Sequence, residues 1–104
     1  VYKRQGHMEP RAYGQKECLE AGIQFARTEG IMPAPEATHA IKGAVDEALK
    51  CKAEGKSKAI LFNLCGHGHF DMQAYMDYFS GNLAEDKFDT EAFEESMASI
   101  PAVN

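Results

Sequence analysis

The sequence predicts an α/β fold, a partial three-layer α/β unit built around a parallel sheet. Apolar stripes with helical spacing alternate with short apolar runs along the chain. One of these runs, residues 59–64, ends abruptly in glycines, histidines, a thiol and a carboxylate. Buried parallel strands deliver polar groups to a site at their carboxyl ends in this way. With 104 residues and 44% hydrophobic content, the chain can form one globular unit at most.

Composition excludes several classes of protein. The formal net charge of −5 argues against a nucleic-acid partner or an anionic membrane surface. No apolar run approaches the ~20 residues that a membrane span needs. The three cysteines, Cys18, Cys51 and Cys65, are odd in number and lack a CxxC spacing, so neither a disulfide framework nor a four-cysteine zinc site is indicated. We therefore expect a protein of the reducing cytoplasm.

The first five residues stand apart from the rest. Residues 1–5, VYKRQ, match the in-frame translation of the end of a transposon adapter used in shotgun sequencing. We expect them to be a sequencing artefact and exclude them from the fold prediction. This interpretation also predicts a reading frame that starts inside a longer gene.

The first helix is predicted over residues 15–28, with Gly30 as the residue that ends it. Its apolar positions recur at three- and four-residue spacing: Cys18, Leu19, Gly22, Ile23 and Ala26. Residues 31–35 are apolar but contain two prolines. They predict a brief strand that leads into a stiff extended loop.

The second helix is predicted from Glu36 or Thr38 to about Cys51, closed by Gly55. One of its faces carries an apolar stripe of Ile41, Ala44, Val45, Ala48 and Leu49. Residues 59–64 then supply a buried strand. Strand, helix and strand together predict a right-handed crossover in a parallel sheet.

Two further helices are expected towards the carboxyl end. Residues 72–79 predict a short helix ended by Gly81, with a stripe typical of core residues at Met72, Tyr75, Met76 and Phe79. A last amphipathic helix is expected from Asp89 or Thr90 to near Pro101. Two strands cannot close a sheet, so the chain is expected to be part of a larger domain.

Two blocks carry a family resemblance: residues 29–40, EGIMPAPEATHA, and residues 62–71, FNLCGHGHFD. Together with residues 9–13 and 25–28 they resemble the carboxyl-terminal region of the tryptophan synthase beta chain, in its second, indole-salvaging type. The resemblance implies a carboxyl-terminal fragment of a fold-type II pyridoxal-phosphate enzyme. Residues 6–83 would form part of the cofactor-binding catalytic domain, and residues 84–104 a tail with a short helix.

The resemblance also implies an activity for the parent protein, a pyridoxal-phosphate-dependent lyase that condenses L-serine with indole to give L-tryptophan. Family members are dimers, so a homodimeric parent is expected, with the remainder of the parent chain as the partner of this segment. The family's Schiff-base lysine, phosphate cradle and indole-pocket carboxylate match no segment of this chain. We therefore expect no catalytic residue here and an inactive fragment.

The resemblance assigns four residues to cofactor binding. Cys65 takes the position of a serine whose hydroxyl meets the pyridine nitrogen, and a neutral thiol likewise leaves that nitrogen largely unprotonated. Gly66 and Gly68 would let the backbone pass close to the ring, although both also suit an ordinary turn. Glu36 matches a family carboxylate near the cofactor, and its place at a helix start also suits a capping role.

Four residues are candidates for support of the active site. His39 follows Glu36 by one helical turn and suits a structural hydrogen bond as well as a catalytic role. Asn63, His67 and His69 lie in a segment that surrounds the family's active site, but no specific duty carries over to them.

A competing interpretation is a small metal-binding module. His67, His69 and Asp71 alternate, and an extended backbone would place all three on one side of a strand, as a three-ligand zinc site needs. The glycines between them favour a turn instead. A third interpretation, compatible with the family resemblance, is an inert fragment of an enzyme.

Overall fold

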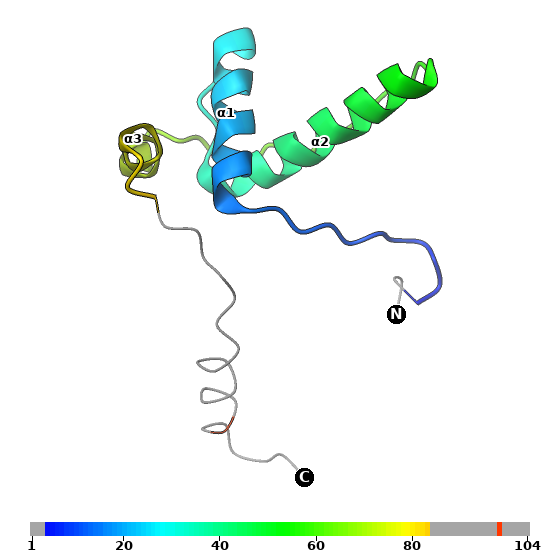
Figure 1. Cartoon of the computed structure of the whole chain (residues 1–104), viewed down its shortest axis with the longest axis horizontal. Helices are drawn as coiled ribbons and strands as arrows, with labels where there is room; N and C mark the ends of the chain where they lie inside the picture. The colour runs from blue at the N-terminus through cyan, green and yellow to red at the C-terminus, as the bar shows by residue number, and fades with distance from the viewer. Residues whose placement is uncertain (1–3, 84–97, 99–104) are drawn as a thin grey trace.

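The computed structural model describes residues 4–83 and residue 98, and within them the chain is helical (Figure 1). Its elements are α1 (Gln15–Glu29), α2 (Pro35–Glu54) and α3 (Met72–Ser80). They confirm the helices predicted over residues 15–28, 36–51 and 72–79. The helix expected after Asp89 lies outside the described residues.

Local sequence explains where these helices begin and end. The backbone N–H of Gly14 donates to Glu17 Oε1 at 2.8 Å at the start of α1, and Pro35 occupies the first turn of α2, where its missing N–H costs nothing. Each helix ends at a glycine with a positive φ: Gly30 at 72°, Gly55 at 65° and Gly81 at 73°. The predicted helix ends are confirmed.

The core lies where the three helices meet. The amino-terminal halves of α1 and α2 pack together, after which the two helices diverge (Figure 1). Their buried residues include Cys18, Leu19, Ala37, Thr38 and Ile41. From α3 the core receives Tyr75, which is 1% exposed. Within residues 4–83, no helix is long and apolar enough to cross a membrane.

The predicted parallel sheet is not formed within the described residues. Residues 59–64 pair with no other strand there, and Leu61 is 99% exposed. The segment is held at one point by Phe62, whose ring meets that of Phe25 of α1 edge to face at 5.8 Å between centroids. The strand prediction fails because a strand needs a neighbour, and the described chain supplies none beside this run.

Residues 31–35 make a different pairing from the one expected. Pro33 forms an isolated antiparallel bridge with His67, in the turn that follows residues 59–64. Gly68 N–H donates to the Met32 carbonyl at 2.9 Å, and Ala34 N–H donates to the Gly66 carbonyl at 3.4 Å. The prolines at 33 and 35 have no N–H, which limits the pairing to this single bridge.

Candidate functional site

The bridge brings the two sequence blocks of the predicted site together. Residues 32–34 and 66–68, called the paired segments below, are joined by two backbone hydrogen bonds. Cys65 directly precedes one paired segment, and Glu36 closely follows the other in the first turn of α2. Backbone segments separated by about thirty positions in the sequence are thus neighbours in the fold.

Tyr75 of α3 anchors the paired segments through a buried hydrogen bond. Its hydroxyl donates to the Pro33 carbonyl at 2.6 Å, a contact that is buried. Burial, and to a smaller extent the charge of Asp71, raise the pKa of Tyr75. The phenol therefore keeps its proton at neutral pH and remains a hydrogen-bond donor to the Pro33 carbonyl.

Two glycines permit this packing. A Cβ atom at Gly68 would lie 2.5 Å from the Pro33 carbonyl oxygen and 3.2 Å from Cε2 of Tyr75. A Cβ atom at Gly22 of α1 would lie 2.5 Å from Cγ2 of Thr38. The close approach seen at Gly68 is therefore to the chain's own backbone and to Tyr75. Its approach to a cofactor ring stays a prediction.

Cys65 and Glu36 flank the paired segments in the sequence, and Gly66 belongs to one of them. All three are exposed, and Cys65 is a free thiol. Gly66 has a φ of 85°, in the left-handed region that favours glycine, so the turn after Cys65 needs this residue type. Glu36 lies at the positive end of the α2 dipole, which favours its negative charge.

His39 faces α1 through one ring nitrogen. Its Nδ1 lies 3.3 Å from the Sγ atom of Cys18, which is 1% exposed. Burial raises the pKa of the Cys18 thiol, the charge of Glu17 raises it further, and Lys42 acts in the opposite direction. His39 thus makes a contact of the structural kind, and its part in an active site stays a prediction. Sequence reasoning missed Cys18 as its partner, because no spacing relates residues of two different helices.

The remaining support candidates lie on exposed backbone. His69 N–H donates to Nδ1 of His67 at 3.2 Å, and the two imidazole rings are 4.9 Å apart. Asn63 lies elsewhere, in a groove of about 400 Å³ that the segment at residues 60–63 forms with α2. The structure therefore groups the two histidines and separates Asn63 from them.

The metal-site interpretation has no support in the residues that the structure describes. They contain no group of three or more His, Cys, Asp or Glu side chains that could hold a metal ion. The alternation of His67, His69 and Asp71 requires an extended backbone to align the three side chains. Instead the chain turns, with Asp71 N–H donating to the Gly68 carbonyl at 3.0 Å.

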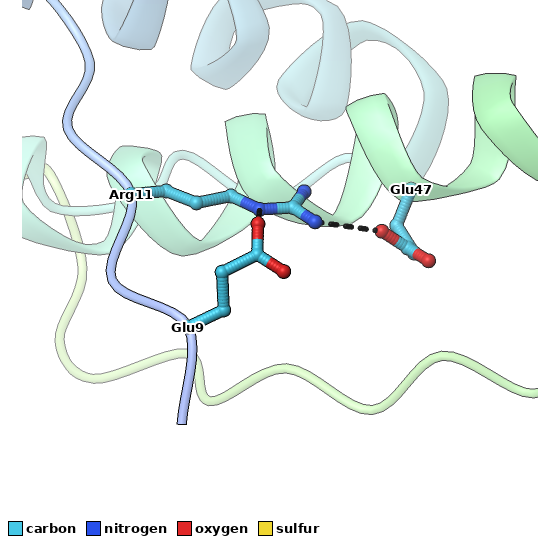
Figure 2. A network of polar contacts seen from close by, with 3 residues as sticks. All are labelled: Glu9, Arg11 and Glu47. Atoms are coloured by element: carbon cyan, nitrogen blue, oxygen red, sulfur yellow. Dashed lines mark hydrogen bonds and ion pairs between the residues drawn. The ribbon is translucent and has the colours of Figure 1, made fainter. Parts of the chain in front are cut away.

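A polar network holds the segment before α1 against α2 (Figure 2). Arg11 Nε lies 3.1 Å from Glu9 Oε1, and its Nη2 lies 3.1 Å from Glu47 Oε2 of α2. Hydrogen bonds to Tyr13, Glu9 and Glu47, in that order, raise the pKa of Arg11. Lys42 forms an ion pair with Asp46, and their hydrogen bond raises the pKa of Lys42. A lysine nucleophile needs a lowered pKa, so this change is in the opposite direction.

Comparison with known proteins identifies the relatives of this chain. No family model matches it. It is 63% identical over 79 residues to tryptophan synthase beta chain 2 of Methanosarcina mazei, which is 76% of this chain and 18% of the relative. The protein of the same name from Aquifex aeolicus is 59% identical over 80 residues, 77% of this chain and 18% of the relative.

A third relative aligns over almost the whole chain. The tryptophan synthase beta chain of Pyrococcus horikoshii is 43% identical over 101 residues, 97% of this chain and 22% of the relative. The chain therefore spans about a fifth of the length of the curated relatives it matches. The chain is thus homologous to part of the tryptophan synthase beta chains, and its high identities are to proteins named as the second type.

Proposed function

We propose that this chain is the carboxyl-terminal part of a pyridoxal-phosphate-dependent lyase that condenses L-serine with indole to give L-tryptophan. The observation that carries the proposal is the 63% identity over 79 residues to a protein named tryptophan synthase beta chain 2. The parent would be a homodimer, and most of its catalytic machinery would lie in other parts of its chain. The segment alone would then be inactive.

The exposed residues beside the paired segments suit a cofactor ring. Pyridoxal phosphate, when bound, supplies the electron sink that lets bonds at the amino-acid substrate break. The free thiol of Cys65 is exposed, and Gly66 next to it has no side chain to obstruct a planar ligand. A neutral thiol is also an adequate hydrogen-bond partner for a ring nitrogen. The residues present thus fit the group.

Each residue would then have a distinct task. Cys65 would hold the pyridine nitrogen without protonating it, and the backbone at Gly66 would lie against the ring. Glu36 would place a carboxylate next to the bound ligands from the start of α2. Tyr75 and Gly68 would have a structural task, because they hold in place the paired segments next to Cys65.

A chimera tests this assignment at Cys65. The homologous segment of the Methanosarcina mazei protein is replaced by this chain, and formation of tryptophan from serine and indole is measured. Cys65→Ser should keep the rate within roughly tenfold, about 1.4 kcal/mol in activation free energy, because both side chains are neutral. Cys65→Asp should lower the rate much further and shift the cofactor absorbance, because a carboxylate favours a protonated ring nitrogen.

Cys51→Ala provides the control, since Cys51 is a second cysteine that lies near the end of α2, away from the paired segments. It should leave the cofactor spectrum unchanged. An inactive chimera would count against the proposed function. A chimera whose activity tolerates aspartate but not serine at position 65 would refute the role of Cys65 alone.

A further inference from the structure

The contact between Cys18 and His39 joins α1 to α2 and is partly buried. The Sγ to Nδ1 distance is 3.3 Å, within the range of a hydrogen bond to sulfur. Cys18 is almost fully buried, whereas His39 as a residue is exposed. One side of the imidazole ring is therefore held by the protein, and the rest of the residue reaches solvent.

The protonation state of the thiol allows it to be the donor in this hydrogen bond. Burial raises the pKa of Cys18 above its ordinary value of 9.0, and the charge of Glu17 acts in the same sense. The thiol is therefore protonated at neutral pH and can donate its S–H. The sulfur can also accept a hydrogen bond, so the contact by itself allows two arrangements. Where the S–H points at Nδ1, that ring nitrogen carries no proton, and the proton of a neutral imidazole is then on Nε2.

We propose that Cys18 is a positioning residue that holds His39 in the tautomer with the proton on Nε2. The ring then presents an N–H donor, instead of a lone pair, on the side away from Cys18. His39 lies one helical turn after Glu36 on the same helix. The significance of this donor for catalysis rests on the proposed function, in which Glu36 faces the bound ligands. The tautomer itself depends only on the contact seen here.

Nitrogen-15 NMR of the full 104-residue chain tests the proposal without cofactor or substrate. Protonated and unprotonated imidazole nitrogens have well-separated chemical shifts, so the spectrum reports the tautomer directly. The chain has four histidines, and the signals of His39 are those lost in His39→Gln. In the wild-type chain at neutral pH, Nδ1 of His39 should appear unprotonated and Nε2 protonated.

Three variants separate positioning from simple packing. Cys18→Ser retains a hydroxyl that can donate and should keep the single tautomer. Cys18→Ala removes the donor, so the ring should sample both tautomers and its two nitrogen shifts should converge. Cys51→Ala removes another buried cysteine, from the far end of α2, and should leave the His39 signals unchanged.

Two results would overturn the proposal: a proton on Nδ1 in the wild-type chain, or a Cys18→Ala spectrum of His39 identical to that of the wild type. If Cys18→Ala does not fold, the wild-type and Cys18→Ser spectra still decide, because a loss of the Nε2–H tautomer in the serine variant also contradicts the proposal. Because no activity is measured, these results are independent of whether the chimera makes tryptophan.

Discussion

Gly68 occupies the tightest position in the candidate site, and its role is visible only in three dimensions. In the sequence it is one of two glycines in CGHGHFD, and both suit a turn or a cofactor contact. In the structure Gly68 is buried, and the absence of a side chain lets its backbone meet Pro33 and Tyr75. Gly66 is different, because it is exposed and its positive φ sets the requirement for glycine.

This contrast predicts the effect of adding one methyl group. Gly68→Ala should destabilise the chain by about 1–3 kcal/mol, because the new Cβ would overlap the Pro33 carbonyl and force the paired segments apart. The midpoint of urea denaturation, followed by circular dichroism, measures this change.

Gly43→Ala is a matched control of opposite sign. Gly43 lies within α2, and a Cβ there would meet only the Tyr13 ring at 3.8 Å. Alanine should therefore stabilise α2 by roughly 0.5–1 kcal/mol, through its higher helix propensity. If Gly68→Ala proved as harmless as Gly43→Ala, the packing role of Gly68 would be refuted.

At the scale of elements, helices could be predicted from the sequence because their signals are local. The apolar stripe of α2 and the glycine at 55 specify that helix without reference to any other part of the chain. The run at residues 59–64 is equally apolar, but strand pairing depends on a neighbour that local sequence does not specify. The antiparallel bridge at Pro33 and the contact of Cys18 with His39 are tertiary features, so neither follows from periodicity.

The stripe predicted for α3 shows the same limit. Its spacing is helical, as expected, yet only Tyr75 of the four residues is buried. Met72 is 43% exposed, Met76 61% and Phe79 64%. The periodicity identifies the apolar face of the helix, but the described part of the chain covers only the portion around Tyr75.

The unpaired segment at residues 59–64 should make the isolated chain associate with itself. It combines an apolar sequence with backbone groups that pair with no strand in the described residues, and such edges promote aggregation. Leu61→Lys adds a charge at a side chain that is 99% exposed. It should lower the apparent molar mass in sedimentation experiments while the helical content stays the same.

Leu49→Lys serves as the comparison, since Leu49 is 57% exposed and lies on α2. It adds the same charge and removes the same side chain, at a position that does not line the groove between α2 and residues 60–63. A reduction in self-association of equal size in both variants would mean that the loss of any exposed leucine, and not the segment at residues 59–64, governs the association.

At the scale of the whole molecule, the chain carries one surface of the proposed site and spans about a fifth of its relatives. The paired segments order Cys65 and Glu36 from within, through Tyr75, but both residues are exposed. In the proposed parent, the rest of the protein would cover this surface and supply neighbours for residues 59–64. The presence of the rest of the parent should then increase protection most at the Cys65 and Glu36 surface and at residues 59–64. It should change protection least in the α1–α2 core.

Amide hydrogen exchange, compared between the isolated chain and the Methanosarcina mazei chimera, measures this difference. Amides of residues 59–71 should exchange much more slowly in the chimera, because strand pairing and burial protect them, whereas protection near Leu19 should change little.

The isolated chain should also make no tryptophan from serine and indole, since binding and covalent attachment of the cofactor would need the rest of the parent. Turnover by the isolated chain, or equal exchange of residues 59–71 in both proteins, would refute the view that this segment functions only within the larger enzyme.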